Sequence, residues 1–196
     1  MKRISAITTV LLAGVLILCG PAKAQDSGFY AGLGVGQSKI NDMCDGATTC
    51  DNKDSSWTGF VGYQINKNFG VELGYVDLGK GTATGTVLGV PVAASADAKT
   101  FELVGVGTIP FGQDFGAFAK LGIHRWSLDV TGIAGGIPVS ASDNGTDLTY
   151  GLGLQWNFHK QAGARLYWQR YENVGDENTT GKSDVDVFGV SVLFRF

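Results

Sequence analysis

The residues of this sequence that could do chemistry are few and widely spaced. His124 and Ser127 would supply a base and a nucleophile for hydrolysis, and Glu102 is one carboxylate that could pair with the histidine. No nucleophile motif of a known hydrolase surrounds His124 or Ser127. We therefore expect a protein that is not an enzyme, and its polar residues must be interpreted through the elements that position them.

Two stretches rich in glycine or aspartate have the composition of ligand loops but do not meet their requirements. Gly32, Gly34 and Gly36 form the pattern G-x-G-x-G, but no helix follows, so a dinucleotide site is not expected. Residues 143–147 are similar to part of a calcium loop but lack the distal glutamate that completes such a loop. We expect no metal site and no cofactor.

The first residues predict a secretory leader. A basic start, Met1-Lys2-Arg3, precedes an apolar run over 10–18 and the cleavage motif Ala22-Lys23-Ala24. The apolar run is too short for a transmembrane helix, which needs about 20 apolar residues. We expect a signal peptide over 1–24 and a single exported domain over 25–196.

The composition of the chain favours a membrane protein over a soluble one. Charged residues make up 17% of the chain and glycine occurs 30 times, whereas soluble domains carry about 25% charge and about 7% glycine. The net charge of −3 becomes more negative without the basic leader, and no basic cluster remains to neutralise phosphates. Nucleic acid is therefore not an expected partner.

Cys44 and Cys50 would be the cysteines that remain after the leader is removed. An exported protein enters an oxidising compartment, where a disulfide between them is the default expectation. A zinc site would need two further ligands that the surrounding residues do not offer. We expect a Cys44–Cys50 disulfide.

Apolar residues alternate with small or polar ones in the last ten residues, Val187 to Phe196. This period of two predicts a β-strand whose large apolar face meets lipid and whose small polar face lines a narrow lumen. The terminal aromatic is similar to the C-terminal assembly signal of bacterial outer-membrane proteins, which assigns Phe196, Phe194 and Val192 to that signal. The same alternation predicts eight strands, near 29–36, 57–65, 71–75, 100–109, 115–126, 148–158, 164–169 and 187–196.

The connections between these strands alternate strictly between short and long. Turns near 66–68, 111–114 and 159–161 are short, and we expect long loops near 38–55, 79–99, 129–147 and 172–185. Short periplasmic turns and long external loops are typical of an outer-membrane barrel. A soluble lipocalin-like barrel would need the opposite arrangement, with large residues inside. The predicted fold class is all-β, an eight-stranded antiparallel up-and-down transmembrane β-barrel with an aromatic girdle that includes Phe29, Tyr63, Tyr75, Trp156, Phe158 and Phe196.

Within this barrel the alternation places several polar side chains in the lumen. Glu72 and Arg165 lie on strands that face each other across the barrel, so their side chains can meet. The simpler reading of this pair is a static salt bridge in the core of the barrel. Glu102 and His124 lie at similar heights on adjacent strands and could pair, either as a pH-responsive site or around a histidine whose hydrogen bonds are satisfied.

Several segments resemble the transmembrane domain of the OmpA family. These are residues 62–66, 70–75, 78–79, 120–122, 164–166, 174–176 and 189–196, which together span nearly the whole exported chain in the same order. The resemblance implies that Glu72 and Arg165 form a lumen plug or gate and that Lys120 and Gln155 occupy neighbouring lumen positions. OmpA continues into a periplasmic domain that binds peptidoglycan, and this sequence ends at Phe196. Anchoring to the cell wall is therefore not expected.

The sequence thus predicts a protein of the bacterial outer membrane with a structural and surface-interaction role and at most a narrow gated pore. A channel for small or hydrophobic solutes is the alternative, and a lipid-modifying barrel enzyme is the third reading. The expected partners are outer-membrane lipid and lipopolysaccharide, the barrel assembly machinery, and host or phage factors at the surface loops. Surface loops bind without a readable code, so the sequence names none of these factors.

Overall fold

The computed structural model describes residues 27–41, 49–87, 90–176 and 181–196, which form antiparallel strands without a helix. Each of the eight strands predicted from the alternation is present, and one short strand is added. Among the described residues, no helix is long and apolar enough to cross a membrane. The strands are β1 (Gly28–Ile40), β2 (Thr49–Asp51), β3 (Lys53–Gln64), β4 (Phe69–Val87), β5 (Val90–Phe111), β6 (Phe115–Ala134), β7 (Ile137–Trp156), β8 (Ala162–Val174) and β9 (Ser183–Arg195).

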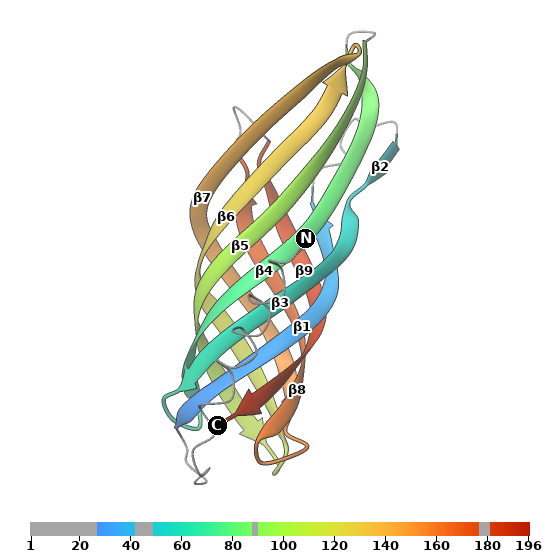
Figure 1. Ribbon diagram of the computed structural model, residues 1–196. Coiled ribbons are helices and arrows are strands. Elements are labelled where there is room, and N and C mark those ends of the chain that lie inside the picture. Colours follow the sequence, from blue (N-terminus) through green and yellow to red (C-terminus); the bar gives the residue numbers. More distant parts are fainter. Residues whose placement is uncertain (1–26, 42–48, 88–89, 177–180) are drawn as a thin grey trace, which may run out of the picture.

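Eight of the strands close into a ring (Figure 1). Their order is β4-β3-β1-β9-β8-β7-β6-β5, and β5 pairs back onto β4. The short strand β2 lies outside the ring and pairs with residues 82–84 of β4. Closure gives every ring strand two partners, which is how a sheet satisfies its backbone groups inside a membrane. The predicted eight-stranded antiparallel barrel is confirmed.

Side chains alternate around this ring as the sequence predicted. The outer side chains of Leu33 and Leu121 are 66% and 65% exposed, whereas the side chain of Glu72 inside the barrel is 0% exposed. Large apolar residues therefore form the outer surface, and polar residues are enclosed. A lipocalin-like barrel has the reverse distribution, so the structure excludes it.

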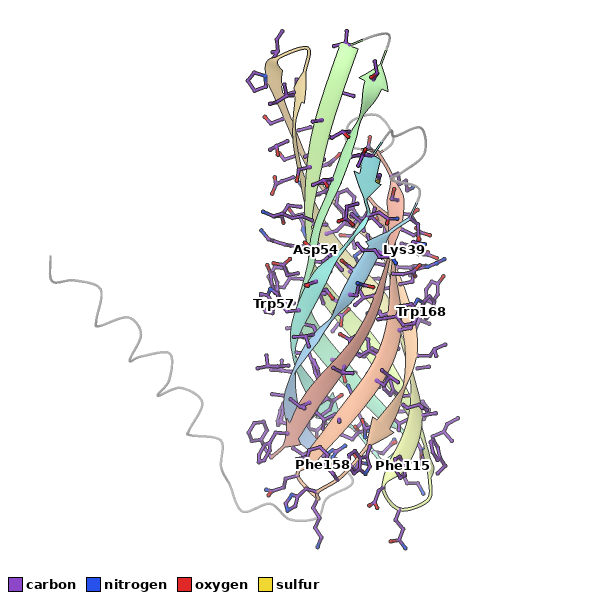
Figure 2. All side chains as sticks on the ribbon, turned by 90° about the vertical axis from the view of Figure 1, so that its right-hand side faces the viewer. Lys39, Asp54, Trp57, Phe115, Phe158 and Trp168 are labelled. Carbon is purple, nitrogen blue, oxygen red and sulfur yellow. The ribbon has the colours of Figure 1, made fainter. Side chains whose placement is uncertain are left out.

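The aromatic side chains form two bands, one at each end of the apolar surface. Figure 2 shows Phe115 and Phe158 near the short turns, and Trp57 and Trp168 further toward the opposite end. Tyr75, which was predicted to belong to the girdle, lies in the outer band and not beside the short turns. Its ring packs on Trp57 and Phe101 at centroid distances of 5.3 and 4.9 Å, in the outer band.

The connections agree with prediction at one end of the barrel and differ at the other. The short turns fall at residues 65–68, 112–114 and 157–161. However, most of the predicted loops 79–99 and 129–147 are paired strands in the upper halves of β4, β5, β6 and β7. Parts of these segments, such as residues 81–86, alternate glycine or alanine with threonine, so they lack the contrast between lipid and lumen faces that marks the other strands. Gly135 and Gly136, with φ of 58° and 86°, close the β6–β7 hairpin in the type I′ conformation that tight hairpins favour.

Candidate functional site

The predicted lumen residues come from strands on opposite sides of the ring. Glu72 is on β4 and Arg165 is on β8, and these strands are four places apart in the ring of eight. Lys120 is on β6, which lies midway between β4 and β8 on the side of the ring that contains β5 and β7. The alternation of each strand turns all three side chains inward, where they are buried. A lumen this narrow lets long side chains meet across its axis.

Glu72 is the centre of the charged cluster. Arg165 Nη1 donates to Glu72 Oε1 at 2.5 Å, and Lys120 Nζ lies 2.8 Å from Glu72 Oε2. The Tyr30 hydroxyl donates a second hydrogen bond to Oε1 at 2.7 Å. The carboxylate is thus held by two cations and a phenol, which compensates for its removal from water.

Arg165 is fixed by further contacts on its other sides. Its Nε donates to Gln155 Oε1 at 2.9 Å, and its guanidinium carbon lies 4.9 Å from the centroid of the Phe118 ring. The Phe60 and Tyr30 rings are at 5.5 and 5.6 Å. Aromatic faces attract a guanidinium group electrostatically, so these rings hold Arg165 in the lumen in addition to its ion pair.

Glu102 is the second carboxylate of the lumen and lies further from the short turns. Gln169 Nε2 donates to Glu102 Oε2 at 2.6 Å, and the Tyr171 hydroxyl donates to the same oxygen at 2.9 Å. Lys120 Nζ lies 3.8 Å from Glu102 Oε1. Lys120 therefore connects the two carboxylates of the lumen, Glu72 and Glu102.

The expected pair between Glu102 and His124 is not formed. The two residues are register partners on β5 and β6, but within the described chain no hydrogen bond or ion pair joins their side chains. His124 Nδ1 lies 3.1 Å from Thr100 Oγ1, and Nε2 donates to the Glu172 carbonyl at 3.0 Å. Its ring also packs edge-on against Tyr171, at 5.2 Å between centroids. Both ring nitrogens of this fully buried histidine are thus occupied, as one of the two readings of the sequence expected.

An apolar cluster lies in the lumen beyond this polar network. Its side chains come from five strands and are almost completely buried, and they belong to Val76, Leu78, Ala98, Trp126, Leu128, Tyr171, Val174, Val185 and Val187. The polar network itself borders an internal cavity of about 10 Å³. This volume holds about one water molecule, so the side chains of the polar network leave little space around the cavity.

The chemistry open to this arrangement is charge pairing, because the other candidates are separated or incomplete. His124 points into the lumen, whereas Ser127 is exposed on the opposite face of β6. No group of three or more His, Cys, Asp or Glu residues within the described ranges could hold a metal ion. Cys50 lies in β2 and takes part in a disulfide, while Cys44 is outside the described residues, so the Cys44–Cys50 pairing stays a prediction.

The sequence analysis did not identify three residues of the lumen network, Tyr30, Gln169 and Tyr171, as site residues. Tyr30 and Gln169 follow the period-two alternation that turns side chains into the lumen, but nothing in the sequence indicates which carboxylate each one reaches. Tyr171 follows the last alternating residue that was assigned to its strand. The alternation continues through it in the structure, where its side chain is 2% exposed. Extending the period-two pattern by two residues would have found it.

A closed ring of eight strands with an apolar exterior, a polar filled interior and two aromatic bands defines a small β-barrel protein of the bacterial outer membrane. The model of the OmpA-like transmembrane domain matches residues 24–196, and the chain therefore belongs to that family. This confirms the resemblance found in the sequence.

Two relatives that are similar to this chain over its whole length carry the name outer membrane protein A. Outer membrane protein A of Yersinia pseudotuberculosis is 29% identical, and that of Salmonella typhi 28% identical, over the whole of this chain. The chain spans 56% of the length of each.

Two solved barrels have the same fold at low sequence identity. The attachment invasion locus protein Ail of Yersinia pestis, in complex with the heparin analogue sucrose octasulfate, aligns with a TM-score of 0.55 at 15% identity, covering 87% of this chain and 99% of Ail. The N-terminal barrel of Pseudomonas aeruginosa OprF aligns with a TM-score of 0.53 at 14% identity, covering 88% and 98%. At these identities the similarity concerns the fold.

Proposed function

We propose that this barrel has a structural and surface-interaction role in the outer membrane, with a lumen that is closed at rest. The observation that carries this proposal is the packed polar network, because the cavity that it borders has a volume of about 10 Å³ and holds about one water molecule. The alternative, an open channel for small or hydrophobic solutes, would require a continuous cavity. The upper halves of β4 to β7 rise past the ends of β8, β9 and β1 (Figure 1) and supply surface for contact with other molecules.

A narrow gate is a second candidate function, and the contacts of Glu72 favour it. Arg165 and Lys120 hold different oxygens of the same carboxylate and come from different strands. Either cation could retain Glu72 while the other moved away, so the ion pair can be exchanged without leaving the carboxylate unpaired. The apolar cluster around Trp126 and Leu128 would also have to move before an ion could pass.

The proposed partners differ between the parts of the barrel. The apolar exterior faces outer-membrane lipid and lipopolysaccharide. Phe196, Phe194 and Val192 at the C-terminus are proposed as the signal read by the barrel assembly machinery. The Phe196 backbone N–H donates to the carbonyl of Phe29 at 3.0 Å, and Phe29 lies in β1, the strand that pairs with β9.

Host or phage factors are proposed to bind the extended end of β4 to β7. The upper part of β6 and β7, residues 126–148, contains three aspartates and neither lysine nor arginine. This charge disfavours a sulfated polyanion such as the one bound to Ail and favours a positively charged partner.

Capture of partners by intact cells tests the surface role. Cells that display the wild-type protein should retain a factor that cells displaying a variant with shortened β4–β5 and β6–β7 hairpins do not. The variant must still shift mobility on boiling in SDS, which shows that its barrel has assembled. Equal capture by both kinds of cells would contradict the surface-interaction role.

Two further experiments test the alternative functions. Single-channel recording tests the solute channel, and a lipid A modification assay tests the lipid-modifying enzyme.

A further inference from the structure

Two lysines lie directly opposite each other on the outer surface of β1 and β3. Lys39 and Lys53 are register partners in this antiparallel pair, and both side chains are exposed. The backbone N–H of Ile40 donates to the Asn52 carbonyl at 2.9 Å. The adjacent lysines therefore form the kind of pair in which opposite side chains lie closest, with Cα atoms about 4.5 Å apart. Like charges in this position repel each other and destabilise the sheet.

The carboxylate nearest to these two lysines, which we call the lysine pair, is already occupied. Asp186 on β9 is the register partner of Lys39. Its carboxylate accepts hydrogen bonds from Arg170 Nε and Nη2 at 2.8 and 2.7 Å, and from Asn41 Nδ2 at 2.9 Å. Asp186 is therefore not free to neutralise Lys39.

No other carboxylate of the described ranges neutralises the lysine pair. Asp51 accepts a hydrogen bond from the backbone N–H of Lys53 at 3.2 Å, and neither ammonium group of the pair forms an ion pair with a described residue. The exposed lysines of β4 and β5 differ, because Lys80 and Lys99 both bind Asp97, at 3.3 and 3.4 Å. The lysine pair is thus a local excess of two positive charges.

The lysine pair lies just beyond the apolar surface, at the end of the barrel opposite the short turns. Val35 and Trp57 are register partners four residues nearer to those turns on the same face, and their side chains are 62% and 48% exposed. Four residues of a strand tilted by about 35–45° rise roughly 10 Å. Figure 2 shows Lys39 further from the short turns than Trp57 and Trp168. Because tryptophan marks the boundary of the hydrocarbon layer, the ammonium groups lie at the headgroups of the outer leaflet.

The surface below the lysine pair changes from polar to apolar toward the centre of the membrane. Gln37 and Ser55 are register partners that lie between the lysine pair and Trp57, and both are exposed. Leu33 and Val61 continue the apolar surface beyond Trp57, with exposures of 66% and 56%. An acylated, phosphorylated lipid has the same order of groups, since its acyl chains are followed by ester or amide links and then by phosphate.

A phosphate monoester fits the lysine pair better than a carboxylate or a diester. It has three acceptor oxygens and a charge of about −1.5 to −2 at neutral pH, so one group can neutralise both ammonium groups. Free phosphate could not use the apolar surface below, and phosphatidylglycerol has a diester with a single charge. Lipopolysaccharide carries phosphate monoesters on an acylated sugar, so it satisfies both requirements.

We propose that Lys39 and Lys53 together bind a phosphate group of lipopolysaccharide, whose acyl chains pack on the apolar surface around Val35 and Trp57. This inference rests on the proposed contact of the barrel exterior with outer-membrane lipid and lipopolysaccharide, and it names the residues of the site. The bound phosphate removes the repulsion within the lysine pair. A ligand that binds only the folded barrel also stabilises it, so the lipid should raise the melting temperature.

The first test compares lipid A with dephosphorylated lipid A that has the same acyl chains. Native mass spectrometry of the purified barrel in a neutral detergent measures the affinity for each lipid. We expect lipid A to bind at least tenfold more tightly. If both forms bind equally, the exterior still contacts the glycolipid, but the lysine site is wrong. If neither form binds, the proposed contact with lipopolysaccharide itself is wrong.

Phosphatidylglycerol is the second lipid in this test, because it supplies a negative charge without a monoester. It should bind more weakly than lipid A. Equal affinity for the two lipids would overturn the assignment to lipopolysaccharide, since any anionic lipid would then occupy the site.

Matched variants locate the site on β1 and β3. Lys39→Gln and Lys53→Gln should each weaken lipid A binding about tenfold, the effect of losing one hydrogen bond to a charged group. Lys39→Arg keeps the charge and should retain most of the affinity. Lys99→Gln is the control, because it removes the same charge from the same end of the barrel at a lysine that Asp97 already neutralises. Equal weakening by Lys99→Gln would overturn the assignment.

Thermal melting gives a readout that a general attraction between cations and lipid would not produce. In neutral detergent without lipid A, Lys39→Gln should raise the melting temperature, because it removes the like-charge repulsion. With saturating lipid A, the same variant should melt below wild type, because it binds the stabilising ligand more weakly. Each variant must still shift mobility on boiling in SDS, which reports assembly. A melting temperature that is lower for Lys39→Gln under both conditions would overturn the proposal, since the two lysines would then not repel each other.

Discussion

Glu72 on β4 and Arg165 on β8 are 93 residues apart in the sequence and meet across the barrel, with Arg165 Nη1 2.5 Å from Glu72 Oε1. Lys120 holds the second oxygen of the same carboxylate at 2.8 Å. Glu72 therefore has two cationic partners, whereas each cation has other contacts to retain it. This asymmetry makes Glu72 the residue on which the packing of the lumen depends most.

Stability measurements should reveal this asymmetry. Glu72→Gln leaves two buried cations without their shared partner and should cost about 3–5 kcal/mol, the cost of breaking a buried ion pair from one side. Arg165→Met should cost about 1–3 kcal/mol, because Lys120 still neutralises Glu72. Urea unfolding in lipid vesicles, followed by tryptophan fluorescence, gives both values. A larger loss for Arg165→Met than for Glu72→Gln would contradict the central position of Glu72.

The ion pair between Arg170 and Asp186 predicts a pH dependence at the outer end of the barrel, beyond Trp168. Arg170 Nε and Nη2 donate to Asp186 Oδ1 and Oδ2 at 2.8 and 2.7 Å. Partial burial raises the pKa of Asp186, but the hydrogen bonds from Arg170 and Asn41 outweigh it and hold the pKa below its usual value of 3.8. A folded-state pKa below the unfolded one stabilises the fold above the unfolded value, and this stabilisation is lost as pH falls through the folded value.

We therefore expect Asp186→Asn to lower the melting temperature at pH 7. The difference from wild type should shrink as the pH falls below 3.8, where the wild-type carboxylate begins to be protonated in the unfolded chain. Asp129→Asn is the control, because the Asp129 side chain is exposed on β6 and makes no ion pair within the described residues. A difference between wild type and Asp186→Asn that stayed constant down to pH 2 would show that the charge pair does not contribute.

The predicted disulfide between Cys44 and Cys50 can be tested by thiol labelling. Labelling of the exported protein should require prior reduction, because a disulfide leaves no free thiol to react. Cys44→Ser should expose a single reactive thiol and leave the barrel assembled, since Cys50 lies in β2 outside the ring. The mobility shift on boiling in SDS reports assembly. Ready labelling of the unreduced wild-type protein would exclude the disulfide.

The fold was predictable because lipid and lumen impose opposite demands on alternate residues. Val190, Val192 and Phe194 identify the lipid face of their strand because all three are large and apolar. The same contrast between a large apolar face and a small or polar face recurs around the ring. The paired upper halves of β4 to β7 were not predicted because small and polar residues occur on both of their faces. Residues such as Ser140 and Ala141 then show no contrast that could distinguish a strand from a loop.

The lumen residues were predictable as a set, but their partners were not. Alternation places Glu72, Arg165, Glu102 and His124 inside the barrel. It does not determine which side chain extends along the lumen axis and which extends across it. Register alone favoured Glu102 with His124, whereas Glu102 reaches toward Lys120 and the histidine toward Glu172. Strand tilt and side-chain length decide these contacts, and neither can be read from the spacing.

Single-channel recording of the purified protein in planar bilayers tests the closed lumen most directly, with Arg165→Ala and Arg165→Ala combined with Trp126→Ala as variants. We predict that wild type shows no sustained conductance. Arg165→Ala should raise the conductance by removing a side chain from the polar network, and the combination should raise it further because Trp126 belongs to the apolar cluster beyond that network. A steady open conductance in most wild-type channels, unchanged in either variant, would contradict the account.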